Sequence, residues 1–506
     1  MRLLITILLT AISCLLQTAA YAYDFKVGDL EYDVTSYENH EVAVTGCPNK
    51  AIQSIDIPKF VTTDNGIRYI VRSINDAKEW GSAYHGVFSD CNALTSITLP
   101  ESLTYIGTFA FYKCTSLTSV NLPKSLTNIG RSAFSRCSSL TSISQPESLT
   151  RIEDYAFYGC SSLSSVNFAE SLTSIGTGAF SGCSSLVAVN LPESLTWIGS
   201  IAFKDCSSLA AVNLPESLAT IQEATFSGCS SLSYLKLPRS LNRICNYAFY
   251  GCSSLESVEL PESLQYIEYG AFRGCSSISS VNIQKAQVGQ GAFANCAQLQ
   301  KIDVSPDHYY TQIDGVLFAN NVLLQYPAGR ESAEYYIPES TDYILDYAFE
   351  GSKRLNTLYI PANISKIGDQ AFLYCTELRT IYSSSQEPPA ASSSSFSGVP
   401  TDAVVYIPKG SFDKYFVANG WQRFSDFREW DPSGIDEAIN DASAYGVVVT
   451  TEGNIVKLAN KQPESVCKVY NMQGLRMAET NASEITLPHP GMYIVEIEGT
   501  TKKVSI

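Results

Sequence analysis

Nine cysteines recur at one constant interval of 23 residues, with no insertion between the first and the last: Cys91, Cys114, Cys137, Cys160, Cys183, Cys206, Cys229, Cys252 and Cys275. Such regularity requires each stretch of chain to stack on the previous one in the same register. A fixed period of this length is typical of a repeat protein whose core lies between neighbouring turns. We therefore expect a solenoid, in which the column that a residue occupies predicts the face of the turn on which it lies.

The repeat is close to L-x-x-V-N-L-P-E-S-L-T-x-I-G-x-x-A-F-x-x-C-S-S. The run L-x-x-V-x-L predicts a short strand and matches the opening of the leucine-rich repeat pattern. Pro123 ends that strand, since proline donates no ladder hydrogen bond, and Leu126 to Ile129 form a second extended run. Gly130 then leads into a short helical or 3₁₀ turn around Ala133 and Phe134. The expected fold class is a leucine-rich repeat solenoid of short parallel strands and short helical or 3₁₀ turns, followed by a small antiparallel β-sandwich.

The most constant part of the repeat is I-G-x-x-A-F-x-x-C-x-x-L, found for instance as Ile175, Gly176, Ala179, Phe180, Cys183 and Leu186. This motif resembles that of the BspA-like leucine-rich repeat family of bacterial surface proteins. The resemblance extends from Tyr23 to about Trp430. It implies a recognition or adhesion protein that binds a host protein, a matrix component or another cell.

The chain divides into six expected regions: 1–22 signal peptide, 23–87 N-terminal segment and cap, 88–304 regular repeats, 305–345 irregular repeat with a hairpin insertion, 346–432 terminal repeats and C-terminal cap, and 433–506 β-sandwich. Short alternating strands separated by turn residues favour a sandwich in the last region. Val469-Tyr-Asn-Met-Gln-Gly474 and Pro490-Gly-Met-Tyr-Ile-Val495 resemble the sorting domain of type IX secretion, a route across the outer membrane of Gram-negative bacteria. A terminal domain that caps or spaces is the alternative.

The first 22 residues have the pattern of a secretion signal. Arg2 precedes an apolar run from Leu3 to Leu16, and Ala20-Tyr21-Ala22 forms a small-x-small cleavage site. The apolar run is too short to predict a membrane span, and no other segment could cross a bilayer. Cys14 weakly resembles a lipoprotein cleavage site, which is the alternative. We expect a secreted protein or one on the outer membrane or cell surface.

The fourteen cysteines beyond this leader leave two interpretations open. Exported proteins usually pair their cysteines, so a disulfide framework is one of them. The other is a column of reduced, buried thiols, because each cysteine follows phenylalanine at a fixed offset and stacked side chains point in parallel. Without C-x-x-C, and with four scattered histidines, no metal or cofactor is expected. A net charge of −16 argues against nucleic-acid binding and against attachment to anionic lipid.

No catalytic arrangement interrupts the repeats, so we do not expect an enzyme. The repeated glutamates, such as Glu101, Glu193 and Glu216, could in principle supply paired carboxylates. A regular acidic column is more typical of a solvated edge. Cys245 lies outside the cysteine column, where a tolerated substitution and a reactive thiol are both possible interpretations.

The columns that vary between repeats are expected to face solvent and to carry the binding function. Aromatic residues and arginine dominate the energetics of interfaces. The candidate partner-binding residues are Tyr105, Arg151, Trp197, Arg243, Tyr266, Tyr269, Tyr234 and Lys236. A protein on a host or another cell is the expected partner, a glycan is the alternative, and a passive spacer is a third possibility.

Overall fold

The fold is known from a computed structural model, which describes residues 23–80, 83–306, 309–430, 448–452, 455–459, 466–471, 476–487, 492–497 and 500–505. The chain divides into two compact units, Met1–Ile267 and Glu268–Ile506. The fold class is a β-solenoid with repeats of about 23 residues and almost no helix, followed by antiparallel sheets, as the repeat pattern predicts.

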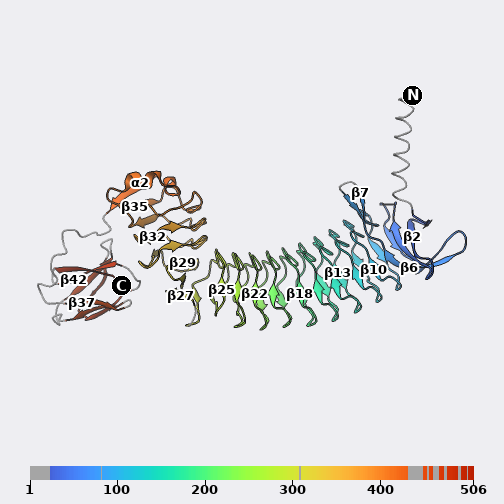
Figure 1. Cartoon of the computed structure of the whole chain (residues 1–506), viewed down its shortest axis with the longest axis horizontal. Helices are drawn as coiled ribbons and strands as arrows, with labels where there is room; N and C mark the ends of the chain where they lie inside the picture. Colours follow the sequence, from blue (N-terminus) through green and yellow to red (C-terminus); the bar gives the residue numbers. More distant parts are fainter. Residues whose placement is uncertain are drawn as a thin grey trace, which may run out of the picture. The chain divides into compact units, whose positions relative to one another are not determined.

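In the first unit, the first strands of successive repeats up to β21 join one parallel sheet, the first-strand sheet. Equivalent residues pair at the repeat interval, for example Ser142 with Ser165 and Ala211 with Tyr234. Figure 1 shows these turns side by side. The strands are β4 (Ser54–Asp56), β9 (Ser96–Thr98), β11 (Ser119–Val120), β13 (Ser142–Ser144), β15 (Ser165–Asn167), β17 (Ala188–Asn190), β19 (Ala211–Asn213) and β21 (Tyr234–Lys236).

The second extended run of each repeat forms a separate set of parallel pairs, the second-strand sheet, which begins on an N-terminal cap. In the cap, β6 pairs with β3 and β10, while β1, β2 and β5 add antiparallel partners. The cap strands are β1 (Phe25–Val27), β2 (Leu30–Ser36), β3 (Glu41–Gly46), β5 (Phe60–Thr62), β6 (Arg68–Ile74), β7 (Lys78–Trp80) and β8 (Ala83–His85). The repeat strands are β10 (Tyr105–Ile106), β12 (Asn128–Ile129), β14 (Arg151–Ile152), β16 (Ser174–Ile175), β18 (Trp197–Ile198), β20 (Thr220–Ile221), β22 (Arg243–Ile244) and β23 (Tyr266–Ile267).

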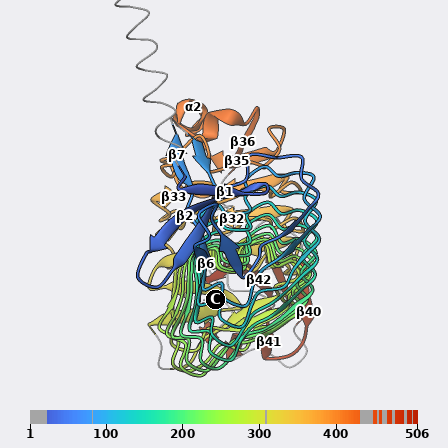
Figure 2. The same ribbon diagram turned by 90° about the vertical axis from the view of Figure 1, so that its right-hand side faces the viewer.

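Stacked phenylalanine rings form the centre of the core. From Phe88 to Phe249 the rings lie nearly parallel, with centroids 5.0–5.6 Å apart on successive turns. The constant serines hold neighbouring turns in register: Ser125 Oγ donates to the Leu103 carbonyl at 2.6 Å, and Ser194 Oγ repeats this with Leu172. The same turns overlie one another in Figure 2. Each constant residue therefore either fills the core or satisfies a backbone group of the turn before it.

The segment before each cysteine is a series of hydrogen-bonded turns, whereas a helical or 3₁₀ turn was expected there. Around Phe134, the amides of Ala133 and Cys137 donate to carbonyls three residues earlier. Between them, the amide of Ser135 also donates three residues back, whereas the amides of Phe134 and Arg136 donate to the next repeat, as Phe134 does to Ala156 at 2.8 Å. Helical continuation stops because Ser132 and Arg136 have left-handed φ values of 55° and 62°. Each turn thus shares its hydrogen bonds with its neighbour.

The second unit continues the solenoid and carries an antiparallel interruption. β27, β28 and β29 form a meander, after which parallel pairing resumes in β31 and β33 and in β30, β32, β34, β35 and β36. Trp421 closes this core: it is fully buried, and its indole nitrogen donates to the Pro389 carbonyl at 2.9 Å. The elements are β24 (Ser280–Asn282), β25 (Gln287–Val288), β26 (Lys301–Asp303), β27 (Tyr310–Ile313), β28 (Val316–Ala319), β29 (Val322–Gln325), β30 (Glu334–Tyr336), β31 (Tyr343–Ile344), β32 (Thr357–Ile360), β33 (Lys366–Ile367), β34 (Thr380–Ser383), β35 (Val404–Pro408), α2 (Phe412–Val417), η1 (Trp421–Arg423) and β36 (Asp426–Trp430).

The C-terminal region forms two antiparallel sheets. One contains β37, β38 and β41, and the other contains β40, β39, β42 and β43. Their buried residues, including Val456, Val469 and Val495, form one small apolar cluster. The strands are β37 (Val448–Glu452), β38 (Ile455–Ala459), β39 (Cys467–Asn471), β40 (Arg476–Thr480), β41 (Glu484–Thr486), β42 (Met492–Ile497) and β43 (Thr500–Ser505).

Candidate functional site: the outward faces of the solenoid

The candidate residues of the first unit do not share one sheet. Tyr105, Arg151 and Trp197 project from β10, β14 and β18 of the second-strand sheet. Arg243 and Tyr266 continue the column on β22 and β23, where pairing has started again from β20 after a break that follows β18. Tyr234 and Lys236 lie on β21 of the first-strand sheet. The two strands of one repeat enter different sheets, so these residues do not form one continuous patch.

Within the second-strand column, only some side chains are available to a partner. Trp197 is 51% exposed. Arg151 forms an ion pair with Glu153 at 2.8 Å. The Tyr105 hydroxyl donates to Asp76, and burial together with that carboxylate raises the pKa of Tyr105 to about 12. Trp197 is therefore the strongest candidate for a partner contact, whereas Tyr105 is held by its hydrogen bond to Asp76.

The C-terminal end of this column is also engaged. The guanidinium carbon of Arg243 lies 4.3 Å from the centroid of the Tyr266 ring, a close cation–π contact. Tyr269 belongs to the second unit, where its ring packs edge-on against Tyr347 with centroids 5.7 Å apart. We interpret Arg243 and Tyr266 as one stacked pair, and Tyr269 as a packing residue.

A groove of about 330 Å³ follows β21 on the first-strand sheet. In the described part of the first unit this sheet ends at β21, because residues 255–260 of the next turn form no strand. Tyr234, which is 59% exposed, lines the groove with Lys236, Arg239, Glu259 and Leu260. The groove thus combines an exposed aromatic ring with charges of both signs.

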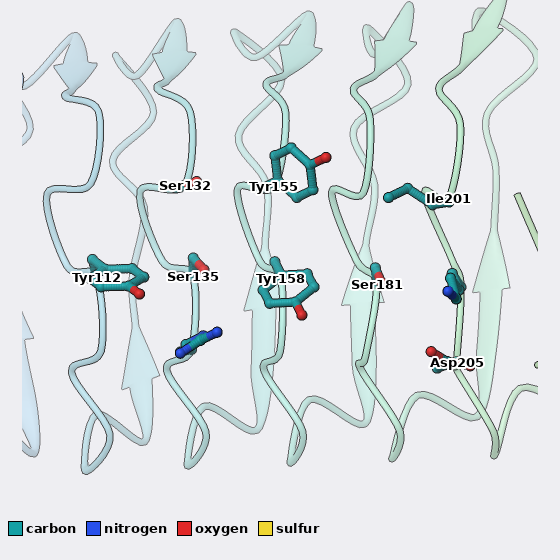
Figure 3. A pocket seen from close by; sticks show the side chains of 10 residues that line it. Tyr112, Ser132, Ser135, Tyr155, Tyr158, Ser181, Ile201 and Asp205 are labelled. Atoms are coloured by element: carbon teal, nitrogen blue, oxygen red, sulfur yellow. The ribbon is translucent and has the colours of Figure 1, made fainter. Parts of the chain in front are cut away.

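A second groove of about 410 Å³ lies on the turns that precede the cysteines, and the sequence analysis did not identify it. Figure 3 shows rings on the turns of Tyr112 and Tyr158, with the serine-bearing turn of Ser135 between them. Ser135 and Ser181 are buried, while the rings remain partly exposed. The sequence does contain a signal for it, because large and small residues alternate here from repeat to repeat with a period of 46 residues.

The repeated glutamates serve the backbone. Glu101 accepts a hydrogen bond from the amide of Lys124, and Glu193 accepts one from the amide of Glu216, each at 3.2 Å and each from the equivalent position one repeat later. Glu216 does the same for Arg239 at 2.8 Å. Among the described residues, no three histidine, cysteine or acidic side chains are grouped as a metal site. The carboxylates of this column thus have a structural role on every turn where these bonds occur.

The cysteine column consists of buried free thiols. From Cys114 to Cys252, each Sγ–H donates to the carbonyl of the phenylalanine 26 residues earlier, at 3.1–3.3 Å. Burial raises the pKa of Cys160 and of Cys206 to about 12. Each of these thiols therefore satisfies a backbone acceptor inside the core, and Cys160 and Cys206 stay protonated at neutral pH.

The leader residues Ala20 and Ala22 lie outside the described part of the chain. Within that part, none of the helices has the length and apolar character needed to cross a bilayer.

Comparisons with known proteins place the repeats in a family. No curated protein matches the chain. Solved structures similar to it include a leucine-rich repeat protein from Bacteroides ovatus (27% identity, covering 81% of this chain and 100% of that chain, TM-score 0.49). Others are a leucine rich cell surface protein from Faecalibacterium prausnitzii (23%, 81% and 95%, 0.38) and the T. pallidum leucine rich repeat protein (29%, 46% and 90%, 0.33). Residues 82–210, 196–325 and 330–413, which are more than half of the chain, match the family described as BspA type leucine rich repeat region. The chain therefore belongs to the BspA-type leucine-rich repeat family.

Proposed function

We propose that the protein is a non-enzymatic binding protein, secreted or displayed on the cell surface, that adheres to a protein of a host, of its matrix or of another cell. Leucine-rich repeat proteins generally bind proteins, and this fold is typical of proteins without catalytic activity. The observation that carries the proposal is the exposure of large aromatic residues on the columns that vary between repeats. Trp197 and Tyr234 are each more than half exposed, although the equivalent positions of neighbouring repeats hold serine, threonine or alanine.

Exposed aromatics of this kind contribute most of the energy in protein interfaces when a partner covers them. Trp197 lies on the second-strand sheet and Tyr234 lines the groove beside β21. The proposal therefore has two candidate contact regions on the first unit, and they can be tested independently.

Two multiple variants separate these regions. The first replaces Arg151, Trp197, Arg243 and Tyr266 with alanine, and the second replaces Tyr234 and Lys236. Each is measured for binding to extracellular matrix proteins and host cells, with a thermal melt to establish folding. Val187→Ala removes an apolar side chain that is 53% exposed outside both sets, and it is the matched control.

We expect at least one multiple variant to lose tenfold or more in affinity while its melt and the control remain unchanged. Retained binding in both variants would exclude these contact regions. If the wild-type protein binds neither proteins nor glycans above background, a passive spacer is the better assignment.

We also propose that residues 1–22 direct export, with cleavage after Ala22, and that residues 433–506 act in type IX sorting. The small-x-small pattern at Ala20 and Ala22 supports the first proposal, and the resemblance of the C-terminal strands and turns to a sorting domain supports the second. Mass spectrometry of the exported protein should find Tyr23 at its N-terminus. Deleting Ser433–Ile506 should abolish surface display in a Gram-negative host, and persistent display would show that the region only caps or spaces.

A further inference from the structure

The turns that precede the cysteines alternate strictly between large and small side chains over seven consecutive repeats. Two positions of each turn follow this rule, the second being three residues after the first. Large pairs are Phe109 and Tyr112, Tyr155 and Tyr158, Ile201 and Lys204, and Tyr247 and Tyr250. Small pairs between them are Ser132 and Ser135, Gly178 and Ser181, and Ala224 and Ser227.

Packing between turns explains why a small residue must follow a large one. At Gly178, an added Cβ would lie 2.6 Å from Cε1 of Tyr155, so this ring occupies the space that a side chain on the next turn would need. Within a large turn the two rings pack edge-on, with Tyr155 and Tyr158 centroids 6.0 Å apart. Alternation therefore leaves room for the Tyr155 ring and accompanies a recess over the small turns of Ser135 and Ser181.

The large residues at the first of these positions lie in the left-handed region of φ. Phe109, Tyr155, Ile201 and Tyr247 all have φ between 52° and 56°, a region that glycine occupies without strain and that bulky or β-branched residues avoid. Ser132 and Ala224 on the small turns share this conformation, so it belongs to the repeat itself. Glycine at Gly178 shows that the fold tolerates a residue without a side chain there.

The recess around Ser135 and Ser181 has the dimensions of a ligand site. Its volume is about 410 Å³, its floor consists of buried serines, and Tyr112 and Tyr158 stand on the large turns beside it. Successive parallel strands lie about 4.8 Å apart, so the two-turn period is roughly 10 Å. An extended glycan with equatorial linkages has a disaccharide repeat of similar length, and the C–H faces of its sugar rings pack well against aromatic rings.

The charges that line this recess favour an anionic ligand, although the whole chain carries a net charge of −16. Arg136, whose guanidinium carbon lies 6.0 Å from the Tyr158 centroid, and Lys204 supply two cations against one acid, Asp205. Two acids that precede Tyr155 in the chain are engaged elsewhere. Glu153 pairs with Arg151 at 2.8 Å, and Asp154 accepts the Thr177 amide at 2.7 Å.

We infer that this face binds a linear acidic glycan that carries a carboxylate on alternate sugars, with its chain running along the stacked turns. One sugar ring stacks on Tyr112 and the next but one stacks on Tyr158, the sugar hydroxyls meet the serine floor, and the carboxylates lie near Arg136 and Lys204. The inference does not depend on the proposed protein partner, since Trp197 and Tyr234 lie on other faces.

Hyaluronan decasaccharide, in which uronate and amino sugar alternate, is the probe for isothermal titration with the full chain. A neutral cello-oligosaccharide of the same length is the comparison ligand. Tyr158→Ala removes one ring, the Arg136→Gln and Lys204→Gln pair removes the cations, and Ser135→Tyr fills the recess from the small turn. Trp197→Ala, on another face, is the matched control.

We expect saturable hyaluronan binding that is at least tenfold tighter than binding of the neutral oligosaccharide. Tyr158→Ala should weaken it at least tenfold with an unchanged melt, and the glutamine pair should reduce its salt dependence. Ser135→Tyr should also weaken it at least tenfold, at a melting temperature lowered by crowding against the neighbouring turns. No hyaluronan binding, equal binding of the neutral sugar, or full binding by every folded groove variant would overturn the inference. Loss of binding in Trp197→Ala alone would place the glycan on the second-strand sheet and overturn it equally.

Discussion

Alkylation of the native protein by iodoacetamide at pH 8 should distinguish the column thiols from Cys245. The thiolate is the nucleophile, so the rate follows the ionised fraction. Burial raises the pKa of Cys160 and of Cys206 from 9.0 to about 12. At pH 8, roughly one thiol in ten is ionised when its pKa is 9.0, and roughly one in ten thousand when its pKa is about 12.

The expected rate for Cys160 and Cys206 is therefore about a thousandfold below that of an ordinary thiol, even before steric exclusion is considered. Cys245 is only partly buried and should react at a rate closer to the ordinary one. Each modified cysteine is quantified by peptide mass spectrometry over a time course. The same reaction in guanidinium chloride is the control, in which every cysteine should be modified rapidly.

Two results would refute the reasoning. If Cys160 and Cys206 react in the native protein as fast as Cys245, they are not protected by the core. If they stay unmodified in guanidinium chloride until a reductant is added, the column is paired in disulfides. The hydrogen bonds from Cys160 to Phe134 and from Cys206 to Phe180 would then not exist in the isolated protein.

Two further predictions concern stability. Burial raises the pKa values of Cys160, Cys206, Tyr32 and Tyr326 to about 12 in the folded protein, so the unfolded chain loses these protons at lower pH than the folded one. The stability that these groups contribute should be complete below about pH 9 and should fall progressively toward pH 12. A melting temperature that stays constant from pH 8 to 11 would contradict this. Gly178→Ala and Gly251→Ala both place a Cβ at a left-handed φ, which costs roughly 1–2 kcal/mol. Only the first also collides with a neighbour, Tyr155, which should add about 1 kcal/mol or more in urea unfolding; equal losses would show that the ring moves aside freely.

The core could be predicted from the sequence because its positions are repeated. Phe180 and Cys183 recur in every neighbouring repeat, and a residue type that never changes must contact the adjacent turn. The candidate surface was less predictable. Trp197 and Tyr234 lie in columns that vary from repeat to repeat beside columns that stay constant. The sequence nevertheless contains no information on the angle between the two strands of one repeat, and this angle places the two residues on different sheets.

The aromatic recess was missed for a related reason. Tyr155 and Tyr158 belong to columns that look irregular at a period of 23 residues and become regular only at 46. The structure explains the doubled period. At Tyr155 the backbone is left-handed and the ring lies beside Gly178 of the next turn, so a large side chain on one turn is followed by a small one on the next.

By itself, the sequence determined the repeat length, the solenoid and the residues of its core, because register between identical turns leaves one solution for residues that must be buried. The cysteine interval identified a column, and the tertiary structure gave each thiol its partner, a phenylalanine carbonyl of the preceding repeat. The faces available for binding were decided only in three dimensions. Backbone direction decides which side chains are exposed, how the two strands of a repeat separate into sheets and where the recess forms. The aligned repeat sequences do not specify that direction.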